Sequence, residues 1–147
     1  MKRPEATDRS EEMLRALREA GFKLTEQRRA VVALFADDLS HPTAQSIFER
    51  LRVTHETLSF ATVYNTLDAL SKAGSSGVLK VGAAARFDPN TDPHEHAICE
   101  ACERILDLPI ESSAPPESQR ELLERQTGFA VRRVETIYRG LCRDCAG

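Results

Sequence analysis

Residues 94–102 read HEHAICEAC, a short stretch that joins two histidines to a Cys-x-x-Cys pair. The chain has four cysteines, and the other two repeat this spacing near the C-terminus. Each pair puts two thiolates on one turn, and four thiolates can surround Zn2+ in the closed tetrahedral geometry of structural sites. We therefore predict a structural zinc ion bound by Cys99, Cys102, Cys142 and Cys145.

A thioredoxin-like redox motif is the main alternative for a Cys-x-x-Cys pair. Such a motif normally opens a helix after a strand in a βαβ setting, and its chemistry does not need two copies. Two copies at equal spacing favour zinc instead. The ion would join the 99–102 turn to the C-terminus and so hold a small domain together.

The composition is that of a soluble globular protein. The chain has 147 residues, of which 41% are hydrophobic and 29% charged, enough for one ordinary domain or two small ones. Residues 1–10 are polar and no apolar run is long enough to cross a membrane, so we expect no signal peptide, no membrane partner and a cytoplasmic location. The net charge of -3 means that any binding of DNA must depend on a local surface.

Apolar periodicity and capping residues predict short helices followed by a β-hairpin in the N-terminal half. This order is typical of a winged helix-turn-helix domain. The expected N-caps are Ser10, Thr25, Thr43 and Ser59. The helices are expected at 11–20, 25–36, around 43–51 and at 60–72, and the strands at 78–81 and 84–87.

The C-terminal half predicts a small α+β unit. A proline-containing segment at 88–93 is interpreted as a hinge. The order of elements thus predicts an α+β fold with a winged-helix DNA-binding domain at 1–87, the hinge at 88–93, and a metal-binding domain at 94–147. Within the last domain we expect strands at 96–99, 104–108 and 130–138, a Pro/Ser break at 112–116 and a helix at 117–126.

The helix expected at 60–72 is a candidate for reading DNA. Recognition helices carry small and hydrogen-bonding residues in their first turns, where base edges are reached. Val63 and Leu67 would pack inward. An ordinary solvated helix face is the alternative, and the helix alone does not decide between them. The residues that would face DNA are Ala61, Thr62, Tyr64 and Asn65.

A second metal site is indicated next to the zinc ligands. His94 and His96 alternate in an extended segment and therefore share one face. Asp88 precedes them and Asp107 follows, and His41 could join only if the chain folds back. Three imidazoles and two carboxylates suit Fe2+ or Mn2+ better than a thiophilic ion. The remaining histidine, His55, is interpreted as a solvated residue.

Several motifs occur in one order and together resemble the ferric uptake regulator (Fur) family, most closely its peroxide-responsive (PerR) branch. The resemblance extends from about residue 14 to residue 145. In chain order the motifs are HPTA at 41–44, ATVYN at 61–65, RFD at 86–88, HEHAIC at 94–99 followed by Cys102, then Asp107, and finally Cys142 with Cys145.

This resemblance implies a homodimeric winged-helix repressor with a C-terminal dimerisation domain, which binds a double-stranded DNA operator and is not an enzyme. It implies structural Zn2+ at the four cysteines and a regulatory Fe2+ or Mn2+, one of each per subunit. Tyr64 and Asn65 would face DNA. Peroxide, the only small molecule expected to react, would oxidise His41 or His94, and Asp107 favours the peroxide branch because iron-sensing relatives commonly have Glu there. The regulatory ligands would be His41, Asp88, His94, His96 and Asp107.

Three other functions stay open at this point. A manganese- or iron-responsive uptake repressor would use the same ligands without sensing peroxide. A metallohydrolase would need a general base near the ion, but Glu95 alternates away from the two flanking histidines. A zinc-ribbon adaptor would need neither DNA nor the His/Asp site. Residues 75–77, Ser-Ser-Gly, depart from the family pattern and lead us to expect a shorter or looser wing.

Overall fold

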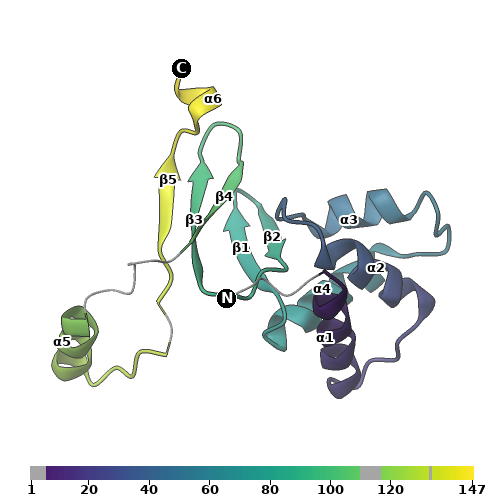
Figure 1. The fold of residues 1–147 in the computed structure, drawn as a ribbon, viewed down its shortest axis with the longest axis horizontal. Helices are drawn as coiled ribbons and strands as arrows, with labels where there is room; N and C mark the ends of the chain where they lie inside the picture. The colour runs from purple at the N-terminus through teal and green to yellow at the C-terminus, as the bar shows by residue number, and fades with distance from the viewer. Residues whose placement is uncertain (1–5, 110–116, 133) are drawn as a thin grey trace. The chain divides into compact units, whose positions relative to one another are not determined.

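A computed structural model describes residues 6–109, 117–132 and 134–147 (Figure 1). The chain forms two compact units, Met1–Thr91 and Asp92–Gly147, and each is described here by itself. The domain limits expected from the sequence, with a hinge at 88–93, stay a prediction. Within the described residues, no helix is both long and apolar enough to cross a lipid bilayer.

Four helices form the first unit: α1 (Ala6–Glu19), α2 (Glu26–Ala36), α3 (Ala44–Leu51) and α4 (Phe60–Lys72). The predicted caps of the last three are present, because the hydroxyls of Thr25, Thr43 and Ser59 each accept a hydrogen bond from the amide three residues on. The prediction for α1 is wrong at its start. That helix begins at Ala6, so Ser10 lies inside it and is not an N-cap. No glycine or proline interrupts residues 6–20, so the helix can extend to the N-terminal side of Ser10.

The core of the first unit lies among these helices. Apolar side chains at helical spacing on α2, α3 and α4 are completely buried, and Phe87 of the hairpin packs against the same cluster. Helix α1 contributes Met13 and Leu17 to this core. Among the described residues, the largest fully buried apolar side chains are Met13, Leu17, Val31, Val32, Phe35, Ile47, Val63, Leu67 and Leu70.

A β-hairpin completes the first unit. Strands β1 (Gly77–Val81) and β2 (Ala84–Asp88) pair antiparallel in continuous register from Gly77 opposite Asp88 to Val81 opposite Ala84. Gly82 has a φ of 61°, which the tight connection requires. Strand β1 begins at Gly77 of the Ser-Ser-Gly segment, one residue earlier than the strand predicted at 78–81, and a shorter or looser wing stays a prediction. Asp88 is thereby the last residue of a strand.

The second unit contains a three-stranded sheet in the order β4-β3-β5. Strand β3 (His94–Cys99) pairs antiparallel with β4 (Ile105–Pro109) and parallel with β5 (Ile137–Gly140). Helix α5 (Glu117–Thr127) precedes β5, and the short α6 (Arg143–Ala146) follows it. The chain reverses after α5 at Gly128, whose φ is 69°.

The strand expected at 130–138 is largely wrong. In the part of that segment that the structure describes, only Ile137 and Tyr138 belong to a strand, which continues to Gly140. Alternating apolar residues favour a strand only where a partner edge is available, and β3 offers β5 the four positions from His96 to Cys99. The Pro/Ser break expected at 112–116 lies outside the described residues.

The fold makes a first prediction about the helical core. Replacement of Leu67 by Ala should lower the free energy of unfolding of the first unit by about 2–5 kcal/mol, because it leaves a cavity among fully buried side chains. The matched control is Leu39→Ala, at a position that is 45% exposed. Urea unfolding followed by circular dichroism would measure both. An equal, small loss for the two variants would contradict the core described above.

Candidate metal centres

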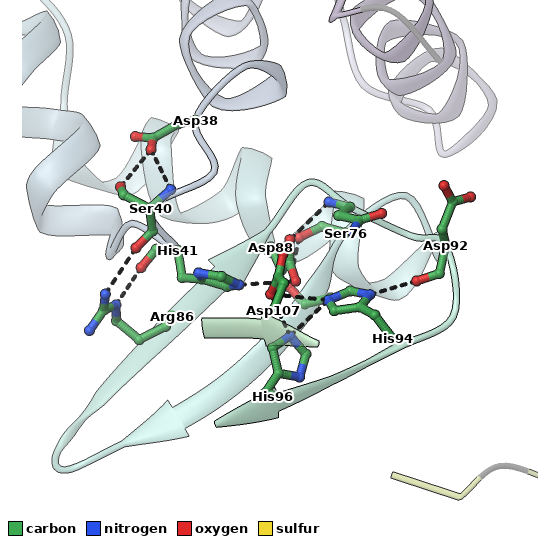
Figure 2. Close-up of polar contacts among 12 residues, drawn as sticks. Asp38, Ser40, His41, Ser76, Arg86, Asp88, Asp92, His94, His96 and Asp107 are labelled. Carbon is green, nitrogen blue, oxygen red and sulfur yellow. Dashed lines mark hydrogen bonds and ion pairs between the residues drawn. The ribbon is translucent and has the colours of Figure 1, made fainter. Parts of the chain in front are cut away.

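Two histidines and an aspartate of the second unit direct their donor atoms to one point. His94 and His96 lie two residues apart on β3 and share a face, and Asp107 of β4 is the register partner of His96. The Oδ1 atom of Asp107 lies 3.4 Å from the Nε2 atom of each histidine. The two Nε2 atoms are 2.9 Å apart. We call these three residues the β3–β4 cluster (Figure 2).

The tautomer of His94 is fixed by its neighbour. The Nδ1 atom of His94 lies 2.6 Å from the backbone carbonyl oxygen of Asp92, and a carbonyl can only accept. The proton of a neutral His94 ring is therefore on Nδ1, and Nε2 presents its lone pair toward Asp107 and His96. Metal-bound histidines commonly have this arrangement, in which the second ring nitrogen donates to a carbonyl. The Asp92 carbonyl is a backbone group, so no residue type in the sequence predicts this contact.

The first unit contributes a buried imidazole and a buried carboxylate. The Nε2 atom of His41 lies 3.2 Å from Oδ2 of Asp88, and each side chain is only 2% exposed. The other carboxylate oxygen, Oδ1, accepts a hydrogen bond from the Asn90 amide at 2.9 Å. We call these two ligand candidates the His41–Asp88 pair. A carboxylate this deeply buried needs such partners, because isolated burial of a charge is very unfavourable.

His41 has an unusual backbone conformation. Its φ is 57°, in the left-handed region that non-glycine residues rarely adopt, although histidine does so more often than most. Three hydrogen bonds from β2 hold the loop there: Arg86 donates to the carbonyl oxygens of Ser40 and His41, and the Phe87 amide donates to that of Pro42. Arg86 belongs to the RFD motif at 86–88, but that motif does not predict the contact of its side chain with the loop.

The chemistry of these donors suits a divalent ion of intermediate to hard character. The β3–β4 cluster offers two imidazoles and a carboxylate, and the His41–Asp88 pair offers one of each. Fe2+ and Mn2+ accept such mixed nitrogen and oxygen ligands. The residues of each unit thus fit the predicted regulatory metal, whose identity the donors alone do not decide.

The four cysteines converge in the second unit and are consistent with a structural zinc site. Their sulfur atoms all lie within 4.8 Å of one another. Cys99 ends β3, and Cys142 directly precedes α6, so the site joins the sheet to the C-terminus. The Sγ atoms of Cys102 and Cys142 are 3.8 Å apart, and the Cys142 amide donates to Sγ of Cys99 at 3.3 Å.

Two of the four thiols have pKa values that are shifted in opposite directions. Backbone amides of Cys142 and Cys102 donate to Sγ of Cys99 and lower the pKa of that thiol to about 6. Hydrogen bonds to the sulfurs of Cys142, Cys102 and Cys99 raise the pKa of Cys145 to about 12. The Cys99 thiol therefore ionises more readily than the Cys145 thiol. Zn2+ binds thiolates, so its binding would displace the remaining protons.

The start of α4 presents the side chains that were predicted to face DNA. Ala61, Tyr64 and Asn65 are exposed, whereas Val63 is buried. The hydroxyl of Thr62 lies 2.9 Å from Oγ of Ser59 and so takes part in the cap of the helix. The positions are suitable for recognition of base edges, and their role in DNA binding stays a prediction.

The cysteine site makes a second prediction. Cys142→Ser should release the zinc, because three thiolates do not complete the tetrahedral site. Without zinc the second unit should unfold or the expected dimer should dissociate, since few apolar side chains are buried in that unit. Zinc content per chain and molar mass by light scattering would be measured. The control is Asp144→Asn, which removes the exposed partner of Arg104 without removing a ligand. A zinc-free variant that stays a folded dimer would contradict the structural role.

The chain is similar to a known family of proteins over most of its length. The model of the ferric uptake regulator family matches residues 19–141. The peroxide operon regulator of Bacillus subtilis is 35% identical over 136 residues, which cover 92% of both chains. The peroxide-responsive repressor PerR of Staphylococcus epidermidis is also 35% identical, over 92% of this chain and 89% of its own.

Solved structures have the same fold. The ferric uptake regulator Fur of Helicobacter pylori, described as having three functional metal binding sites, superposes with a TM-score of 0.76 at 23% identity over 100% of this chain and 98% of its own. The peroxide sensor PerR of Streptococcus pyogenes has a TM-score of 0.50 at 30% identity over 92% of both chains. The chain belongs to the ferric uptake regulator family and is a metal-dependent transcriptional regulator, not an enzyme.

Proposed function

We propose that this regulator is a repressor that senses hydrogen peroxide and controls genes of peroxide stress and metal homeostasis. Its DNA binding would depend on one Fe2+ or Mn2+ per subunit. The observation that carries the proposal is the convergence of donors in the β3–β4 cluster, with its Nδ1-protonated His94. The proposed ligands are His41, Asp88, His94, His96 and Asp107.

Neither set of donors is complete alone. The β3–β4 cluster offers three ligand atoms, and the His41–Asp88 pair offers two, so five protein ligands would leave one position of an octahedron open. We propose that one ion takes ligands from both units and thereby limits the angle between them. In a dimer this angle sets the spacing of two recognition helices, which must match successive major grooves. An ion that binds one arrangement better shifts the population toward it.

Sensing of peroxide would use a ligand histidine as the group that is oxidised. Bound Fe2+ would supply the redox chemistry that activates hydrogen peroxide. In the net reaction a ring C–H of His41 or His94 becomes C–OH, which is a two-electron oxidation of the ring. Hydrogen peroxide accepts these two electrons: its O–O bond breaks, one oxygen atom goes to the ring and the other leaves as water. The oxidised ring is a weaker ligand, so the ion would be lost and the affinity for DNA would fall. Mn2+ would support repression without this reaction.

Two observations favour this function over that of a metal-uptake repressor. Relatives at 35% identity over 92% of the chain are named peroxide regulators, and the carboxylate of the β3–β4 cluster is Asp rather than Glu. A manganese- or iron-responsive uptake repressor without peroxide sensing is the second candidate, because it needs the same five ligands. With either function, we propose a cytoplasmic location, where the operator DNA would be.

The zinc ion and the partners complete the proposal. Regulators of this family bind DNA operators as dimers. The cysteine site would hold structural Zn2+, one per subunit, and Tyr64 and Asn65 of α4 would face the operator together with Ala61 and Thr62. The helix N-terminus, capped by Ser59, would lie near phosphate groups.

A third prediction tests the regulatory ligands. His94→Ala and Asp107→Ala should each weaken Mn2+-dependent DNA binding by roughly a hundredfold or more, since even the loss of an outer partner of a ligand costs about ten- to a hundredfold in metal affinity. Fluorescence anisotropy would be measured on a duplex that the wild-type protein selects from a random library in the presence of Mn2+. The matched control is His55→Ala, outside both sets of donors. Tight Mn2+-dependent binding by Asp107→Ala would refute the proposed ligand set.

A fourth prediction separates the two candidate functions. The Fe2+-loaded protein, treated with hydrogen peroxide, should gain a single oxygen on the tryptic peptide that contains His41 or His94, while the Mn2+-loaded protein should not. Intact-mass and peptide mass spectrometry would measure the addition. If neither form is oxidised at histidine and metal-dependent DNA binding is intact, the protein is a metal-uptake repressor.

A further inference from the structure

Arg86 donates hydrogen bonds to the loop that contains His41, and it is not one of the proposed metal ligands. Arg86 lies two residues before Asp88 on β2, so the two side chains leave the same face of the strand. Its Nη2 atom donates to the carbonyl oxygen of Ser40 at 3.1 Å, and its Nε atom donates to that of His41 (Figure 2). One strand thus offers a carboxylate to the imidazole of His41 and a pair of donors to its backbone.

The contact fixes a conformation that His41 would not adopt unaided. Residues in the left-handed region persist only where their surroundings hold them there. The Phe87 amide adds a third hydrogen bond, 2.9 Å long, to the carbonyl oxygen of Pro42. A change of His41 to a right-handed or extended conformation would rotate the peptide groups on both sides of it. It would therefore break these hydrogen bonds and turn the imidazole away from Asp88.

The beginning of the same loop is held from α3. The Oδ1 atom of Asp38 accepts hydrogen bonds from the amide and the hydroxyl of Ser40, at 2.9 and 2.5 Å. Its Oδ2 atom accepts one from Nη1 of Arg50, which belongs to α3. Ser40 is therefore fixed through its amide by Asp38 and through its carbonyl by Arg86, which leaves His41 little freedom.

We propose that Arg86 is a positioning residue for the regulatory metal: it holds His41 in the left-handed conformation, with Nε2 directed at Asp88, before the ion binds. This inference rests on the proposed function of His41 and Asp88 as ligands. A planar guanidinium can donate to two carbonyls from a fixed fork, whereas the ammonium of lysine is a single point on a flexible chain. Charge alone would therefore not reproduce the effect.

The test is a thermodynamic cycle on the full-length, zinc-containing protein, with Mn2+ as the probe and electron paramagnetic resonance of free Mn2+ as the measurement. Arg86→Gln should raise the Kd for Mn2+ about ten- to a hundredfold, as the loss of other outer partners of ligands does. Arg86→Lys should resemble Arg86→Gln. The matched control, Lys80→Gln, removes one positive charge from the same hairpin and should change the Kd less than twofold. In a His41→Ala background, Arg86→Gln should have no further effect.

A second measurement does not depend on the metal. In the Mn2+-free protein, a carbon–proton correlation NMR spectrum resolves the ring signals of individual histidines. The His41 signal should be shifted or broadened in Arg86→Gln, while the His55 signal should not change and serves as the internal reference. If the His41→Ala protein binds Mn2+ too weakly for the thermodynamic cycle, this NMR measurement tests by itself whether Arg86 positions His41.

Each outcome is interpretable. An unchanged His41 signal, an unchanged Kd for Arg86→Gln, or an equal loss in the His41→Ala background would overturn the role of Arg86. Weakened DNA binding with normal Mn2+ affinity would also overturn it, because Arg86 would then contact DNA instead. Failure of the wild-type protein to bind Mn2+ would overturn the proposed function itself.

Discussion

The burial of a carboxylate beside an imidazole is the constraint on which the first unit depends. Asp88 is almost completely buried, and an isolated charge there would be too unfavourable for a stable fold. Its partner, His41, reaches it only from a left-handed backbone conformation, which costs of order 1–3 kcal/mol. Three hydrogen bonds from β2 to the His41 loop each contribute about 0.5–1.5 kcal/mol. Together they can offset the cost of the left-handed conformation. The strained ligand is thus held by the strand that carries its partner.

The second unit is limited by its small core. The buried apolar cluster of the described residues lies in the first unit, and the second contributes only Ile98, Cys99 and Ile105 to the buried apolar set. Large apolar side chains stay exposed on it, among them Phe129 at 63% and Leu141 at 57%. A single chain of this kind gains little from burial, so a structural metal and a dimer partner both have a physical reason to be there.

Local signals predicted most of what the structure contains. The N-caps at Thr25, Thr43 and Ser59 are one-residue signals with a direct backbone consequence, and α4 has the bounds that its cap and periodicity predicted. The errors concern the bounds of elements, which depend on neighbouring segments as well as on local sequence. Residues 130–136 alternate like a strand, but β5 pairs with β3 at only four positions. Helix α1 begins at Ala6, on the N-terminal side of Ser10, because no glycine or proline interrupts it there.

The candidate site was harder to predict than the elements that carry it. The spacing of His94 and His96 predicted a shared face, and register with β4 then brings Asp107 opposite. By contrast, no sequence pattern predicts that His41 is left-handed, that the Asp92 carbonyl fixes a tautomer, or that Arg86 donates to two carbonyls. These are contacts between residues far apart in the chain, or of the backbone itself, and periodicity carries no information about them.

The His41 loop also links the ligand candidates of the first unit to α3. Thr43 caps α3 two residues after His41, and Asp38 joins the start of the loop to Arg50 on the same helix. Burial raises the pKa of Asp38, but hydrogen bonds from Ser40 and Arg50 outweigh it and leave that pKa below its usual value. The resulting stabilisation is present above the ordinary carboxyl pKa and is lost only as pH falls through the lowered one. At neutral pH Asp38 is therefore charged, and α3 and the ligand loop stay joined.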